Sequence, residues 1–124
     1  QSRGLGDVYK RQTHYWSEYL KYEERCNLVI CISHLGYKYE DDKISDLKLA
    51  KLSKNVDVIV GGHTHTFLEK AVLIKNQENK NVIVNQAGWG ALSLGRIDLK
   101  FSKNKEILDS LSVNEISKKN YAII

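Results

Sequence analysis

The residues best suited to chemistry are two histidines in a glycine-rich segment, GGHTH at 61–65. The segment directly follows the apolar run 56–60, which we expect to be a buried strand. In open α/β sheets, ligands bind beyond the carboxyl ends of the strands, and two glycines permit a sharp turn there. In an extended segment, His63 and His65 point to the same side, so both imidazoles can reach one small volume.

A third histidine stands in the same kind of position. His34 follows the apolar run 28–32, which we interpret as another buried strand. If the two strands are parallel neighbours, their carboxyl ends lie side by side. His34, His63 and His65 then converge at one rim, and neutral imidazole is the commonest protein metal ligand. The fourth histidine, His14, lacks this context and is predicted to be a surface residue of a helix.

The segments that carry these histidines alternate between helix and strand. Tyrosines at spacings of four and three predict a helix over 13–25, and apolar residues at helical spacing predict a second over about 43–54. Together with the runs 28–32 and 56–60, they give the order of an α/β unit. The run 28–32 is continuously apolar, which is typical of a parallel strand that is covered on both faces. We expect the run 56–60, which is apolar except for Asp57, to be a second buried strand.

The second half of the chain follows a different pattern. Short strands are predicted at 71–74 and 82–84, around a polar turn. Residues 94–101 alternate between apolar and polar, and a turn at 102–105 leads into a strand over 106–113. We expect this half to be antiparallel sheet with one wet face.

Each of four smaller features could have either a structural or a functional role. We take Asp57 as the first residue of a strand rather than a partner of an imidazole. Trp89 is expected to be a packed aromatic residue, and Arg96 to face solvent. The loop 86–90 either lines a cleft or only makes a turn, and the sequence favours neither.

The bulk composition limits the possible functions. The chain has 124 residues, of which 42% are hydrophobic, and a net charge of +4. This is enough for one domain or a part of one, and the charge favours a phosphate-bearing small molecule without indicating a nucleic-acid polymer as partner. No apolar stretch approaches the length of a membrane span. Residues 1–12 do not fit the pattern that follows, so we interpret them as a non-native leader and 13–124 as a partial catalytic domain.

Several segments resemble one known family. CISHLG at 31–36 and VDVIVGGHTH at 56–65 resemble the calcineurin-like metallophosphoesterases, in their 5′-nucleotidase branch. VNQAGWG at 84–90 and LGRIDL at 94–99 are similar to the same branch. The resemblance covers roughly 13–113, the C-terminal part of the catalytic domain. It implies an α/β fold that is the incomplete C-terminal half of a two-sheet α/β/β/α metallophosphatase sandwich.

The resemblance also implies an activity and its cofactors. Members hydrolyse phosphate esters, here of nucleotides, with a water activated by two divalent ions (Mn, Zn, Fe or Co) about 3.5 Å apart. His34 and His63 would ligate one metal, and His65 the other. Relatives are commonly exported, which implies a periplasmic or cell-surface location.

The same family pattern contains motifs that this sequence lacks. These are D-x-H, G-D with the bridging aspartate, and G-N-H-D/E, so we assign no catalytic and no substrate-binding residue. We expect the isolated chain to be inactive and its partner to be the N-terminal half of the same domain. The alternatives are a non-catalytic module whose three histidines hold one zinc, a half-protein completed by a separate N-terminal piece, and other family substrates such as cyclic nucleotides or nucleotide-sugar diphosphates.

Overall fold

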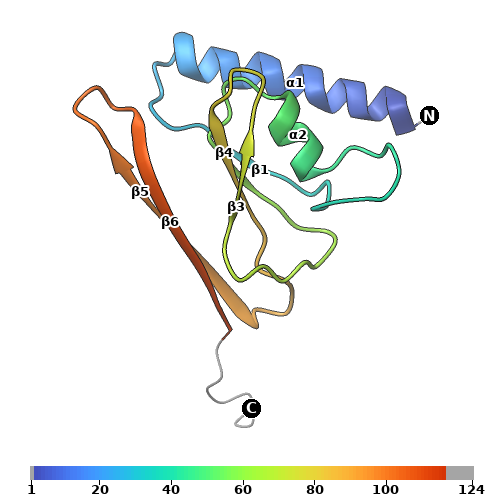
Figure 1. Cartoon of the computed structure of the whole chain (residues 1–124). Coiled ribbons are helices and arrows are strands. Elements are labelled where there is room, and N and C mark those ends of the chain that lie inside the picture. Colours follow the sequence, from blue (N-terminus) through green and yellow to red (C-terminus); the bar gives the residue numbers. More distant parts are fainter. Residues whose placement is uncertain (1, 117–124) are drawn as a thin grey trace.

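A computed structural model describes residues 2–116 as two sheets and two helices (Figure 1). The elements in chain order are α1 Ser2–Tyr22, β1 Ile30–Ile32, α2 Asp46–Leu52, β2 Val58–Val60, β3 Val72–Lys75, β4 Asn81–Asn85, β5 Ser93–Phe101 and β6 Ile107–Ile116. The prediction of an α/β fold with two sheets is therefore confirmed. No helix within the described residues is long and apolar enough to cross a membrane.

Helix α1 begins much earlier than the predicted start at residue 13. It includes most of the segment 1–12, which lacks proline and so contains no strong helix breaker. Gly6 is buried, and a Cβ at this position would lie 3.5 Å from the Cβ of Ile44. These residues therefore pack on the chain that leads into α2, and their non-native origin stays a prediction.

The first sheet has four strands in the order β1-β2-β4-β3. Strands β1, β2 and β4 run parallel, with Ile30 opposite Val58 and Val58 opposite Ile83, whereas β3 is antiparallel to β4. The parallel pairing of the first two strands is confirmed. The expectation that the second half forms its own antiparallel sheet is wrong for β3 and β4, because this hairpin extends the parallel sheet.

Helix α2 covers one face of this sheet. It is shorter than predicted because Ser45 caps its start, accepting a hydrogen bond from the Lys48 backbone N–H, and because the chain turns to extended geometry at Ser53. The buried side chains of this core are Ile44, Leu49, Ala50, Val56, Ile59, Val82 and Val84. They hold α2 against β2 and β4, directly beside the loops that follow β1 and β2.

The opposite face of the sheet is only partly covered. Ile97 and Leu99 of β5 pack on the buried residues Val58 and Ile83. Over β1, in contrast, Ile32 is 87% exposed, and Ile30 and Val60 are also exposed. The expectation that the run 28–32 is covered on both faces is therefore wrong: within the described residues the β5–β6 hairpin reaches only the middle of the sheet.

The β5–β6 hairpin forms the second sheet and lies beside the first (Figure 1). Its turn at 102–105 was predicted, and the Ser102 N–H donates to the carbonyl oxygen of Glu106 across it at 2.8 Å. A buried reciprocal amide pair ties the hairpin to the first sheet: the side-chain amides of Asn85 and Asn114 donate to each other's carbonyl oxygens at 2.8 and 2.7 Å. This pair fixes the hairpin next to the end of β4.

Candidate functional site

Two of the predicted site residues meet at the carboxyl ends of neighbouring strands. His34 follows β1 and His63 follows β2, and because these strands are parallel neighbours their ends adjoin. The Nδ1 atom of His63 lies 3.3 Å from the Nε2 atom of His34, and the ring centroids are 5.0 Å apart. Both imidazoles are exposed at the surface. The predicted convergence therefore holds for this pair.

His65 does not join the pair. The backbone φ angles of His63 and His65 are 70° and 52°, so this segment is a strained turn and the expected extended geometry is wrong. The His65 ring instead stacks on Trp89, with the centroids 6.2 Å apart. Within residues 2–116, no group of three His, Cys, Asp or Glu side chains could hold a metal ion.

Gln86 and Thr64 hold the histidine turn in place. The buried Gln86 amide donates from Nε2 to the Gly62 carbonyl oxygen at 2.9 Å, and its Oε1 accepts from the Thr66 backbone N–H and from the Thr64 hydroxyl. The Thr64 hydroxyl in turn accepts from the Tyr37 backbone N–H at 3.0 Å. The left-handed conformations, which cost free energy, are thus maintained by four surrounding contacts.

A second polar group supports the His34 loop. The Ser33 hydroxyl donates to Oδ1 of the buried Asp46 at 2.5 Å and accepts from the Leu35 backbone N–H at 3.1 Å. Burial raises the pKa of the Asp46 carboxyl, and the hydrogen bond from Ser33 opposes this shift without cancelling it. The loop is therefore fixed on both sides of His34.

The facing nitrogens of the histidine pair are at a distance that suits a hydrogen bond between the rings and also two ligands of one metal ion. Two nitrogen ligands, each about 2.0–2.1 Å from a tetrahedral ion, lie about 3.3–3.4 Å from each other. The two facing nitrogens of His34 and His63 are 3.3 Å apart, so the pair fits as two ligands of one ion. Within the described residues no third ligand joins the pair, and the remaining ligands would have to come from elsewhere.

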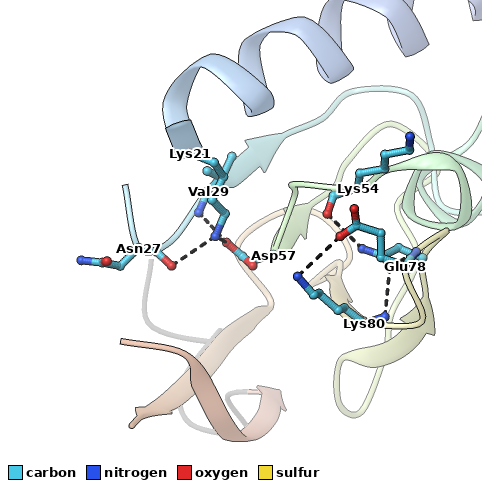
Figure 2. A network of polar contacts seen from close by, with 8 residues as sticks. Lys21, Asn27, Val29, Lys54, Asp57, Glu78 and Lys80 are labelled. Carbon is cyan, nitrogen blue, oxygen red and sulfur yellow. Dashed lines mark hydrogen bonds and ion pairs between the residues drawn. The ribbon is translucent and has the colours of Figure 1, made fainter. Parts of the chain in front are cut away.

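Other singled-out residues lie away from this pair. Asp57, at the opposite end of the sheet, accepts from the Lys21 ammonium at 2.6 Å and from the Val29 backbone N–H at 2.8 Å (Figure 2), so its interpretation as a strand-start residue is confirmed. His14 forms an exposed contact with Glu18, and Arg96 is exposed in β5, as predicted for both. Trp89 is 58% exposed, so the expectation of a packed aromatic residue is wrong.

Sequence reasoning missed the residues that support the histidines. Gln86 lies in the loop 86–90, for which a cleft lining and a plain turn were equally favoured; the structure makes Gln86 an anchor of the histidine turn. Its polar character at the end of an apolar run was the available signal. Asp46 carried no such signal, because an acidic residue in the first turn of a helix is common for reasons of helix stability alone.

The chain is similar to nucleotide phosphoesterases. It is 36% identical over 104 residues to the trifunctional nucleotide phosphoesterase protein YfkN of Bacillus subtilis, covering 79% of this chain and 7% of that protein. It is 32% identical over 107 residues to an apyrase of Tabanus yao, covering 74% and 18%. A snake venom 5′-nucleotidase of Gloydius brevicauda is 32% identical over 97 residues, covering 68% and 16%. No protein-family model matches.

A solved structure has the same arrangement of elements. The 5′-nucleotidase precursor from Thermus thermophilus superposes with a TM-score of 0.76 at 28% identity, over 86% of this chain and 22% of that one. The chain therefore spans less than a quarter of each of these relatives. By sequence and by fold, this chain belongs to the 5′-nucleotidase-like family and corresponds to the C-terminal part of a 5′-nucleotidase domain.

Proposed function

We propose that this chain supplies one side of a binuclear metal site in a hydrolase of phosphate esters, with nucleotides as substrates. The observation that carries the proposal is the facing pair of imidazole nitrogens, 3.3 Å apart at the ends of two parallel strands. His34 and His63 would hold one divalent ion (Mn, Zn, Fe or Co), and His65 would serve the other. When bound, such ions stabilise charge on a phosphoryl group and activate water.

The chain's own residues suit this role in three ways. The imidazoles are exposed and can reach a ligand, while the backbone beneath them is fixed by Gln86 and Thr64. The strained turn is also in keeping with a functional site, since such strain clusters at these sites. The net charge of +4 favours a phosphate-bearing anion.

The exposed apolar face over β1 indicates that a further part of the same domain packs against it. Ile30, Ile32 and Val60 are exposed there, and β1 is one of the two edge strands of its sheet. We infer that the N-terminal half of the domain covers this face and supplies the bridging aspartate and the remaining ligands. Without a bridging carboxylate, two cations at short range repel each other strongly. The chain alone is then expected to show no phosphatase activity.

The single-zinc alternative receives no support from the side-chain positions. It requires three converging histidines, and His65 faces Trp89 instead. The alternative of a half-protein completed by a separate piece has the same site chemistry. A mixing experiment with a separately produced N-terminal half distinguishes it from an ordinary single chain.

The proposal is tested by metal analysis of the full-length protein. We expect about two bound ions per unmodified molecule, and loss of one with most of the activity in His34→Ala and His63→Ala, because each removes a ligand. His65→Ala should also retain about one ion. His14→Ala is the matched control and should behave like the unmodified protein, because the exposed His14 ring pairs with Glu18 on the surface of α1, away from the histidine pair. Normal metal content and activity in His34→Ala would show that the histidine pair is not part of the metal site.

A further inference from the structure

A single buried carboxyl group lies beneath both histidine loops. Asp46, the first residue of α2, has no exposed surface. Its Oδ1 accepts the hydroxyl hydrogen bond of Ser33, which immediately precedes His34. The backbone N–H of Leu35, immediately after His34, donates to the same hydroxyl. The position of His34 therefore depends on this carboxyl through its two neighbours in the chain.

The other carboxyl oxygen touches the second loop. A Cβ at Gly61 would overlap Oδ2 of Asp46 and lie 3.1 Å from its Cγ, so the backbone of Gly61 packs directly on this group. Gly61 leads β2 into Gly62 and His63, and its own N–H donates to the Asn85 carbonyl oxygen. The carboxyl thus contacts the chain just before each of the two facing histidines.

The stability of α2 does not explain this carboxyl. The N-cap role belongs to Ser45, whose hydroxyl accepts from the Lys48 backbone N–H, and the Asp46 backbone N–H donates to the Gly36 carbonyl oxygen. Oδ2 of Asp46 is buried without a hydrogen-bond partner among the described residues. A carboxylate in the first turn favours a helix only weakly, whereas a buried polar atom without a partner costs more free energy than this gain, so helix stability alone does not explain why this carboxyl is buried.

We propose that Asp46 is a positioning residue that sets the separation of His34 and His63 by bracing both loops at once. Its shape and its acceptor oxygen perform this role. The part of the proposal that concerns metal affinity rests on the proposed function, whereas the bracing itself is independent of any metal. A merely structural Asp46 would instead support α2 and its core, and its loss would loosen that region evenly.

Amide hydrogen exchange of the metal-free full-length protein, resolved by peptide mass spectrometry, tests the bracing. We expect Asp46→Ala to accelerate exchange by about tenfold in both 33–36 and 61–64, with a smaller effect in β3 and β4. Ser33→Ala should loosen only 33–36, because the contact with Gly61 remains. Asp46→Asn keeps an acceptor for Ser33 and most of the volume, so it should restore most of the protection and remains informative if Asp46→Ala does not fold.

The matched control is Asp57→Ala, the same substitution at the opposite end of the sheet. It removes bonds to Lys21 and Val29 and should loosen that end while 33–36 and 61–64 stay protected. Unchanged exchange in the two histidine loops of Asp46→Ala, or an equal increase throughout α2 and the first sheet, would overturn the bracing. Equal loosening in Asp46→Asn and Asp46→Ala would also contradict it, because charge rather than shape would then carry the role.

Zinc affinity, measured by competition with a chelator, links the bracing to the site. Residues that orient metal ligands typically change affinity by about 10- to 100-fold when replaced, and we expect a loss in this range for Asp46→Ala with none for Asp57→Ala. Looser loops with unchanged zinc affinity would refute the positioning role. If the unmodified protein binds no zinc or manganese, the proposed function fails, and the exchange data alone decide the bracing.

Discussion

Polar groups at the two ends of the four-stranded sheet differ in how fully they are hydrogen bonded. At the amino ends of β2 and β4, Asp57 is bonded to Lys21 and Val29 (Figure 2). The Asn76 side chain accepts from two backbone N–H groups and donates to the Lys54 carbonyl oxygen. At the carboxyl ends, Asp46 keeps one oxygen without a partner among the described residues, and the nearby turn is strained.

This difference separates residues that stabilise the fold from residues that prepare a site. Buried polar groups are normally hydrogen bonded, so the paired groups at the amino end need no explanation beyond stability. Where strain and an unpartnered atom persist, the surrounding structure must enforce them, and such features cluster at functional sites. Substitutions at the two ends test this contrast.

The largest effect is expected from Gly61→Ala at the histidine end. The new methyl group would overlap Oδ2 of Asp46, and neither the buried carboxyl nor the backbone can move easily. We expect a loss of about 3 kcal/mol in the free energy of unfolding, measured by urea denaturation. Gly4→Ala is the control: it is helical with open space around it and should be neutral or stabilising by up to about 1 kcal/mol. A well-tolerated Gly61→Ala would contradict the tight contact.

Gln86→Ala and Asn76→Ala compare one amide from each end. Each substitution removes the hydrogen bonds that a buried amide side chain makes to the backbone and should cost about 2 kcal/mol in urea denaturation. Only Gln86→Ala should also disturb His63 and His65, seen as shifted imidazole resonances in NMR spectra of histidine-labelled protein. Similar imidazole shifts in both variants would contradict the claim that only the carboxyl end of the sheet positions the histidines.

The Lys21–Asp57 pair should contribute a smaller but measurable coupling. Its Nζ–Oδ2 distance is 2.6 Å, and the two side chains are 22% and 21% exposed. A double-mutant cycle with Lys21→Met and Asp57→Asn should give a coupling of about 1 kcal/mol that weakens only slightly with salt, because the pair is largely shielded from solvent. A coupling energy near zero would indicate that Asp57 stabilises the fold only through the hydrogen bond from the Val29 backbone N–H.

The smallest expected effect is a pH dependence of the free energy of unfolding that arises from Asp46. Burial raises the pKa of Asp46 in the folded chain, while in the unfolded chain it stays near its ordinary value of about 3.9. The folded state therefore binds this proton more tightly, so the stabilising contribution is complete below about pH 4 and is lost as the pH rises through the raised pKa. Asp46→Asn cannot titrate at this position.

Urea denaturation of the metal-free protein between about pH 4 and pH 8 measures this contribution. The stability of the unmodified protein relative to Asp46→Asn should fall as the pH rises through this range. A difference that stays constant, or that grows with pH, would show that the buried carboxyl is not preferentially protonated in the folded state.

The residues alone determined most of the local structure and the meeting of His34 with His63. The apolar run 28–32 and the run 56–60, which is apolar except for Asp57, predicted strands β1 and β2, and alternation with a polar turn predicted the β5–β6 hairpin. Two strand-end histidines on sequential strands meet whenever those strands pair in parallel, which is the common arrangement. These features follow from periodicity and chain direction, which are properties of neighbouring residues.

The details of the site depend on packing between distant segments. The positive φ angles of His63 and His65, the stacking of His65 on Trp89 and the roles of Gln86 and Asp46 depend on residues that are far apart in sequence. The early start of α1 and the bare face over β1 were likewise missed. A periodic pattern records that a side chain prefers burial, but it carries no information on which distant segment will cover it. That choice is made when the elements pack, because each contact depends on the positions of all its neighbours.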